Sequence, residues 1–137
     1  MPVERFLDTN ILLYGYDLDS PAKRTVAQAL IEHAWLNPGS TAVSVQVLQE
    51  FHVNFVRGGH TAADAAQLID DFCRWPVMDN TLELFRLGLS AQKQWRLSLW
   101  DSMIVAAAQM SGARELYTED LNHGQNYGSV QAINPFV

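Results

Sequence analysis

Apolar residues follow two patterns along this chain, short runs and longer stretches at helical spacing. The short runs, rich in Val, Ile, Leu, Phe and Tyr, are typical of buried strands. We predict strands at residues 3–7, 41–43, 75–78, 115–118 and 130–134. Between them, the longer stretches predict helices at residues 11–16, 21–36, 45–57, 62–74, 81–95 and 102–110.

Start and stop signals support these helices. Ser20-Pro21, Ser44, Thr61 and Asn80 are placed to begin a helix, and Asn37-Pro38-Gly39, Gly58 and Gly112 are placed to end one. The stretch 102–110 is apolar nearly all round, so we expect that helix to be central and buried.

Strands that alternate with helices predict a parallel or mostly parallel sheet covered on both faces. The chain has 137 residues, of which 48% are hydrophobic, enough for one sizeable core. Because we find no internal repeat, low-complexity tract or linker, we predict one domain, residues 1–137.

Polar residues follow two of the predicted strands. Asp8-Thr9-Asn10 follows the first strand, and Thr118 and Asp120 lie at the end of the fourth. In open α/β sheets ligands bind beyond the carboxyl ends of the strands, so both acids are candidate site residues. Each could instead cap a turn, and periodicity alone leaves both interpretations open.

Two further acids have comparable settings. Glu50 is too deep in its helix for capping, and its neighbour Phe51 belongs to the buried stripe, so it either has a partner or is a solvated residue at the helix edge. Asp101 forms a capping box with Ser98, which taken alone favours a structural role.

Electrostatic repulsion sets a condition on any site in which Asp8, Glu50, Asp101 and Asp120 converge. Two carboxylates about 4 Å apart at an effective dielectric constant of about 20 repel by roughly 4 kcal/mol, so a cluster needs a cation or raised pKa values. All-oxygen, multiply charged sites suit Mg²⁺ or Mn²⁺, which engage phosphate oxygens. Such a site fits phosphodiester hydrolysis with a metal-activated water.

The order of these segments resembles a known family. Asp8-Thr9-Asn10, the stretch 44–50 ending in Glu50, the stretch 99–108 and the stretch 118–121 are similar to the successive motifs of PIN-domain ribonucleases, in particular VapC-type toxins. The resemblance spans residues 6–136, and the stretches 119–125 and 133–136 are similar to one bacterial subgroup of these toxins.

The resemblance implies a three-layer α/β/α sandwich with a mostly parallel central sheet. It also implies Mg²⁺- or Mn²⁺-dependent endoribonuclease activity on RNA, a homodimer and inhibition by a cognate antitoxin. Transferred by motif, the catalytic and metal-binding residues are Asp8, Glu50, Asp101 and Asp120. The supporting residues are Thr9, Asn10 and Thr118.

Two alternatives stay open at this point. A metal-dependent phosphatase of the haloacid-dehalogenase type also has an aspartate after its first strand, but its pattern requires a second acid where this chain has Asn10. A metal-binding interaction domain that does not cleave RNA has no such conflict. A nicotinamide-binding module is disfavoured because no G-x-G-x-x-G loop follows the first strand.

Composition bears on the surroundings of the protein. Cys73 is the only cysteine, and no run resembles a signal peptide or a membrane-spanning segment, so we expect a reducing, cytoplasmic location without a membrane. The net charge of −6 provides no general attraction to nucleic acid. Any contact with RNA is therefore expected to be local and metal-assisted.

Overall fold

The computed structural model describes residues 2–137, and within them six strands form one sheet in the order β3-β2-β1-β4-β6-β5. The strands are β1 Arg5–Leu7, β2 Thr41–Ser44, β3 Val77–Met78, β4 Glu115–Tyr117, β5 Asn126–Tyr127 and β6 Val130–Ile133. Every pair is parallel except β5 with β6. The predicted mostly parallel sheet is confirmed, whereas the expected loop 121–129 also contains the short strand β5.

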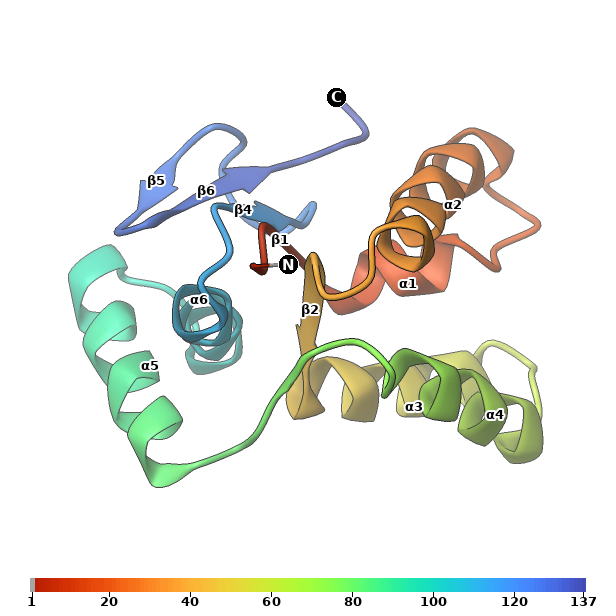
Figure 1. Cartoon of the computed structure of the whole chain (residues 1–137), viewed down its shortest axis with the longest axis horizontal. Coiled ribbons are helices and arrows are strands. Elements are labelled where there is room, and N and C mark those ends of the chain that lie inside the picture. Colours follow the sequence, from red (N-terminus) through yellow and green to blue (C-terminus); the bar gives the residue numbers. More distant parts are fainter. Residues whose placement is uncertain (1) are drawn as a thin grey trace.

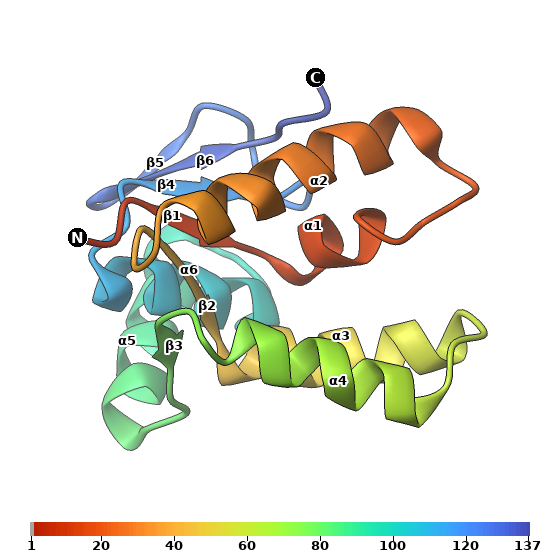
Figure 2. The same cartoon turned by 45° about the vertical axis from the view of Figure 1, so that its right-hand side comes forward.

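Six helices surround this sheet within the described residues. They are α1 Thr9–Tyr14, α2 Pro21–Leu36, α3 Val45–Arg57, α4 Ala62–Phe72, α5 Leu82–Trp95 and α6 Leu99–Ser111. Helices α5 and α6 lie together on one side of the sheet and α1 and α2 on the other, which confirms the three-layer α/β/α arrangement (Figure 1). Helices α3 and α4 form an antiparallel pair that extends outward beyond β2 (Figure 2).

Side-chain caps explain where most helices begin. The hydroxyl oxygens of Ser44, Thr61, Thr81 and Ser98 each accept a hydrogen bond from the backbone N–H three residues later. The prediction of Asn80 as a cap was therefore wrong by one residue. Helix α6 begins at Leu99 because Ser98 caps it, so the residues 98–101 that were predicted to open the apolar stretch 102–110 form its cap and first turn.

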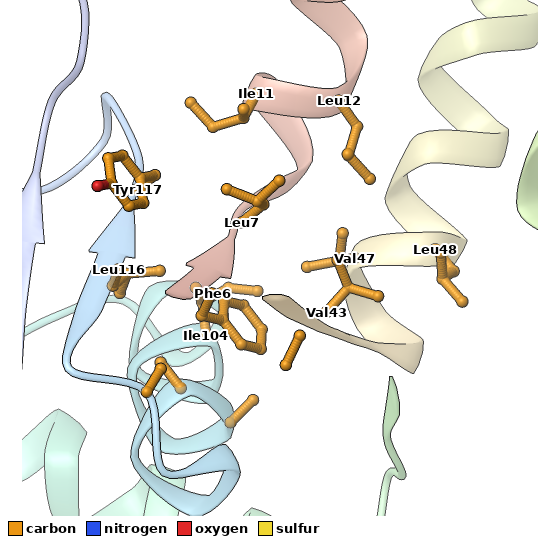
Figure 3. Packing of buried hydrophobic residues seen from close by; sticks show 14 of the residues in the cluster. Phe6, Leu7, Ile11, Leu12, Val43, Val47, Leu48, Ile104, Leu116 and Tyr117 are labelled. Carbon is orange, nitrogen blue, oxygen red and sulfur yellow. The ribbon is translucent and has the colours of Figure 1, made fainter. Parts of the chain in front are cut away.

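The strand β1 lies at the centre of the core. Phe6 and Leu7 are completely buried, and side chains from β2, β4, α1, α3 and α6 gather around them (Figure 3). Complete burial of such side chains contributes about 1.5–3 kcal/mol each. Helix α6 is buried on nearly all sides from Ser102 to Ala108, and its side chains there include the small Ala106 and Ala108, as expected for a central helix.

From residue 2 to residue 137, no helix is long and apolar enough to cross a membrane.

Candidate functional site

The candidate site lies where the strand order reverses. From β1 the chain moves outward to β2 and β3, and it later returns to place β4 on the other side of β1. The backbone N–H of Asp8 donates to the carbonyl of Tyr117 at 3.0 Å, so the carboxyl ends of β1 and β4 remain paired at this edge. A reversal of strand order opens a crevice beyond the strand ends, the usual ligand position in α/β sheets.

Asp8 is the buried acid of this edge, and only 5% of the residue is exposed. Its Oδ1 accepts from the backbone N–H of Thr9 at 2.7 Å, and its Oδ2 accepts from Oγ1 of Thr118 at 2.8 Å. Burial raises the pKa of Asp8 from 3.8 to about 7, and the negative charges of Asp120 and Glu50 add to this, while the two hydrogen bonds lower it. Asp8 also caps α1, which confirms the capping interpretation, and its position at the carboxyl end of β1 is compatible with a role in the site.

Asp120 is joined to the same edge through two neighbours. Its backbone N–H donates to Oγ1 of Thr118 at 3.1 Å, and its Oδ2 accepts from Nδ2 of Asn10 at 2.9 Å. Burial raises the pKa of Asp120, and the negative charge of Asp101 raises it further. Within residues 2–137, the buried Oδ1 of Asn10 has no hydrogen-bond partner, which leaves one oxygen acceptor free at the site.

Glu50 reaches the site from α3. The hydroxyl of Thr9 donates to Oε2 of Glu50 at 3.0 Å, and Nε2 of Gln46 donates to Oε1 at 2.9 Å. The same Nε2 of Gln46 donates to the carbonyl oxygen of Trp100 at 3.2 Å. Glu50 therefore has polar partners on both carboxylate oxygens and is not a freely solvated residue.

Asp101 lies in the first turn of α6, where its backbone N–H donates to the hydroxyl of Ser98 at 3.1 Å. This confirms the half of the predicted capping box in which the hydroxyl of Ser98 accepts from Asp101. Its carboxylate also lies close enough to Asp120 to raise the pKa of that residue. Glu50 contributes to the raised pKa values of both Asp8 and Asp120, so Asp120 is electrostatically linked to each of the other three acids.

The residues present fit a divalent cation by their chemistry. The site offers only oxygen donors, as Mg²⁺ and Mn²⁺ prefer, and its acids suffer mutual repulsion and burial that a cation would relieve. In the part of the chain that the structure describes, no three His, Cys, Asp or Glu side chains lie close enough together to hold one metal ion as they stand.

Sequence reasoning missed a second polar cluster beside Asp120. Lys23 donates to Oε2 of Glu119 at 3.0 Å and to the hydroxyl of Tyr14 at 3.1 Å, and that hydroxyl donates to Oε1 of Glu119 at 2.6 Å. The cluster joins α1, α2 and the segment after β4. Only tertiary structure brings these three residues together, so no local signal could have identified them.

The spacing of four residues on one helix face places Gln46 beside Glu50, but the sequence gives no signal for its contact with α6. His123, in the loop after Asp120, accepts a hydrogen bond from the backbone N–H of Asn134 at 2.9 Å through Nδ1. In this structure it stabilises the segment after β6.

These features define an α/β protein with an acidic, all-oxygen site beyond the carboxyl ends of its central strands. The sequence model of the PIN domain matches residues 5–127, which is most of the chain. The chain therefore belongs to the PIN domain family.

Solved structures with the same fold include three toxin–antitoxin proteins. A chain of a toxin–antitoxin complex from Klebsiella pneumoniae has a TM-score of 0.70 at 19% identity, covering 96% of this chain and 98% of its own. VapC20 of Mycobacterium tuberculosis, described as a sarcin-ricin loop cleaving toxin, has a TM-score of 0.63 at 22% identity. The match covers 85% of this chain and 92% of VapC20. A chain of DNA-bound VapBC from Salmonella typhimurium has a TM-score of 0.65 at 17% identity, and the match covers 95% of this chain and 96% of that one. No curated protein sequence matches this chain.

Proposed function

We propose that this protein is a metal-dependent endoribonuclease and the toxin of a type II toxin–antitoxin pair. The observation that carries the proposal is the linkage of three acid-bearing segments: Thr118 connects Asp8 to Asp120, and Thr9 connects the start of α1 to Glu50. The fold shared with a toxin described as cleaving the sarcin-ricin loop, and with chains of toxin–antitoxin complexes, supports this assignment.

In this proposal Asp8, Glu50, Asp101 and Asp120 hold Mg²⁺ or Mn²⁺. When bound, the cation supplies a water of lowered pKa and neutralises charge at the scissile phosphate. The role of Thr118 is to orient the carboxylate of Asp8 through its hydroxyl, and that of Asn10 is to orient Asp120 through its amide.

The proposal includes partners and a location. We expect a cognate antitoxin to inhibit the protein, a homodimer to be its oligomeric state, and RNA in the cytoplasm to be its substrate. The net charge of −6 means that RNA binding must depend on local contacts and on the cation.

RNA cleavage by the purified protein tests the proposal. We expect cleavage with Mg²⁺ or Mn²⁺, none with EDTA, and none for Asp8→Asn, whose amide is nearly isosteric but lacks the charge that holds the cation. Growth inhibition on expression should be lost in the same variant. Asp79→Asn, an exposed loop acid, is the matched control and should remain active. Metal binding without cleavage of any RNA would favour the non-cleaving interaction domain instead.

A further inference from the structure

Gln46 is a buried polar residue that no step of the proposed reaction uses. It lies in the first turn of α3, and only 8% of the residue is exposed. Its single amide nitrogen contacts two separate acid-bearing elements, at 2.9 Å from Oε1 of Glu50 and 3.2 Å from the carbonyl oxygen of Trp100. Trp100 immediately precedes Asp101, so one amide connects α3 with the turn of α6 that carries the third acid.

The first contact restricts the conformation of Glu50. A glutamate has several rotatable bonds, and fixing them costs conformational entropy. Thr9 already engages Oε2, and Gln46 engages Oε1, so both oxygens of Glu50 have donors that hold one conformation. Two donors that hold one conformation lower the conformational entropy lost when Glu50 becomes a ligand.

The second contact restricts the first turn of α6. A carbonyl in that turn already accepts from within its own helix, so an additional side-chain donor is required only to connect the helix to a neighbour. By bonding to Trp100, Gln46 fixes how far the turn that bears Asp101 lies from Glu50.

The chemistry of glutamine suits both contacts. Its NH₂ group carries two hydrogens, which matches the two acceptors, and it has no charge. A lysine in this position would neutralise Glu50 and compete with a cation, whereas a glutamate would repel Glu50 and provide no donor.

We propose that Gln46 is a positioning residue that keeps Glu50 and the Asp101 turn of α6 arranged for joint binding of a divalent cation. This inference rests on the proposed function, since it concerns the same acids. Outer residues that orient metal ligands typically change metal affinity by about 10–100-fold when they are removed.

Mn²⁺ titration by calorimetry tests the inference on Gln46→Met, which keeps the length and helix propensity of the side chain but removes both donors. We expect the Kd for Mn²⁺ to rise by about 10–100-fold. Gln49→Met, an exposed position on the same helix, is the matched control and should stay within about twofold of wild type. Melting in EDTA checks that each variant is folded. If Gln46→Met does not fold, Gln46→Asn serves in its place, because its shorter amide cannot reach both acceptors.

A double-mutant cycle separates positioning from a general structural role. In the Glu50→Gln background the ligand is already lost, so adding Gln46→Met should weaken Mn²⁺ binding much less than it does in wild type. Two results would overturn this inference alone while the wild-type protein still binds Mn²⁺. One is a Kd for Mn²⁺ in Gln46→Met equal to that of wild type, and the other is an equal loss of Mn²⁺ affinity from Gln46→Met in both backgrounds. Failure of the wild-type protein to bind Mn²⁺ would overturn the proposed metal dependence as well.

Discussion

Asp8 lowers the stability of the metal-free fold in a pH-dependent way. Its pKa is raised from 3.8 to about 7, mainly by burial, so between these values the folded chain binds more protons than the unfolded chain. The stability that protonated Asp8 contributes is therefore complete below pH 3.8 and is lost as the pH rises through about 7. The maximum slope from one such group is about 1.4 kcal/mol per pH unit.

The variant Asp8→Asn should remove this slope, because an amide does not titrate. In EDTA, the free energy of unfolding of the wild-type protein should fall more steeply than that of Asp8→Asn between about pH 5 and about pH 7. Urea denaturation at three pH values in this range measures both slopes. The exposed Asp79→Asn should keep the wild-type slope. Parallel slopes for wild type and Asp8→Asn would show that Asp8 titrates alike in the folded and unfolded chains.

Thr118 and burial have opposite effects on the pKa of Asp8. Its hydroxyl donates to Oδ2 of Asp8 and is the strongest influence that lowers the pKa of that carboxyl. Replacement by the similarly shaped valine should raise the pKa of Asp8 further and leave a buried oxygen without its donor, at a cost of about 1–3 kcal/mol.

In Thr118→Val we expect the rate of RNA cleavage to rise with pH as in wild type, but at higher pH. Thr118→Ser keeps the hydroxyl and should restore the wild-type profile even if it melts lower, because it loses a buried methyl group. Cleavage rates measured across a pH series decide this. A uniform loss of rate in Thr118→Val without a shift of the profile would mean that Thr118 does not act through the protonation of Asp8.

At the scale of elements, the start of α6 combines a cap and a candidate ligand in four residues. The hydroxyl of Ser98 accepts from the backbone N–H of Asp101, so Asp101→Asn leaves this cap intact. Ser98→Ala should destabilise the protein by about 0.5–2 kcal/mol and leave the Mn²⁺-induced rise in melting temperature unchanged. Asp101→Asn should instead reduce that rise, because Mn²⁺ stabilises the folded state to an extent that increases with its affinity.

Scanning fluorimetry with Mn²⁺ and with EDTA separates these two effects. In EDTA, Asp101→Asn also relieves repulsion with Asp120, so its melting temperature should not fall below that of wild type. A pure capping role for Asp101 requires the opposite: a loss of about 0.3–1 kcal/mol in both conditions and a normal response to Mn²⁺.

Elements with strong local signals could be predicted from the sequence, and weaker ones could not. The four helices capped by Ser44, Thr61, Thr81 and Ser98 were all predicted: the first two begin at the predicted residues, and the other two begin one to three residues away. Helix α1 was predicted to begin at residue 11, but it begins at Thr9 because Asp8, which we assigned to a loop, provides its cap.

The strand β5 had no pattern that could be recognised. Only Asn126 and Tyr127 form it, and its two partners are in β6, reached through a turn at Gly128 with a φ of +65°. Tyr127 is buried against Trp95, with ring centroids 5.5 Å apart, so tertiary packing rather than periodicity fixes this strand.

The candidate site also has a part that could be predicted from the sequence and a part that could not. The acids and their immediate neighbours could be assigned from motif order, because each motif is contiguous in the chain. The contacts that arrange them were not predictable, since Gln46 meets Trp100 and Lys23 meets Glu119 only after folding. The assignment of Asp8, Glu50, Asp101 and Asp120 as the metal site stays a prediction until the amide variants are measured.

At the scale of the whole molecule, one helix retains an apolar stripe facing solvent. Leu82, Phe85 and Leu89 on α5 are 63%, 41% and 42% exposed, and their spacing places them on one face of the helix. An apolar stripe of this kind is unusual on a monomer, and soluble oligomers are most often two-fold dimers. The stripe is therefore the surface on which we expect the proposed homodimer to form.

In a two-fold interface the same residue contributes from both copies, so one charge placed in the stripe is introduced twice and is buried near its own symmetry mate. We expect Phe85→Lys to convert the dimer into a monomer at tens of micromolar, measured by light scattering. Leu36 is more exposed and lies at the end of α2, outside this stripe, so Leu36→Lys is the control and should remain dimeric. Phe85 is already 41% exposed in the single chain, so the variant should melt close to wild type at protein concentrations at which both are monomeric. A wild-type protein that is monomeric at tens of micromolar would contradict the homodimer, whereas a dimer that persists in Phe85→Lys would place its interface away from this stripe.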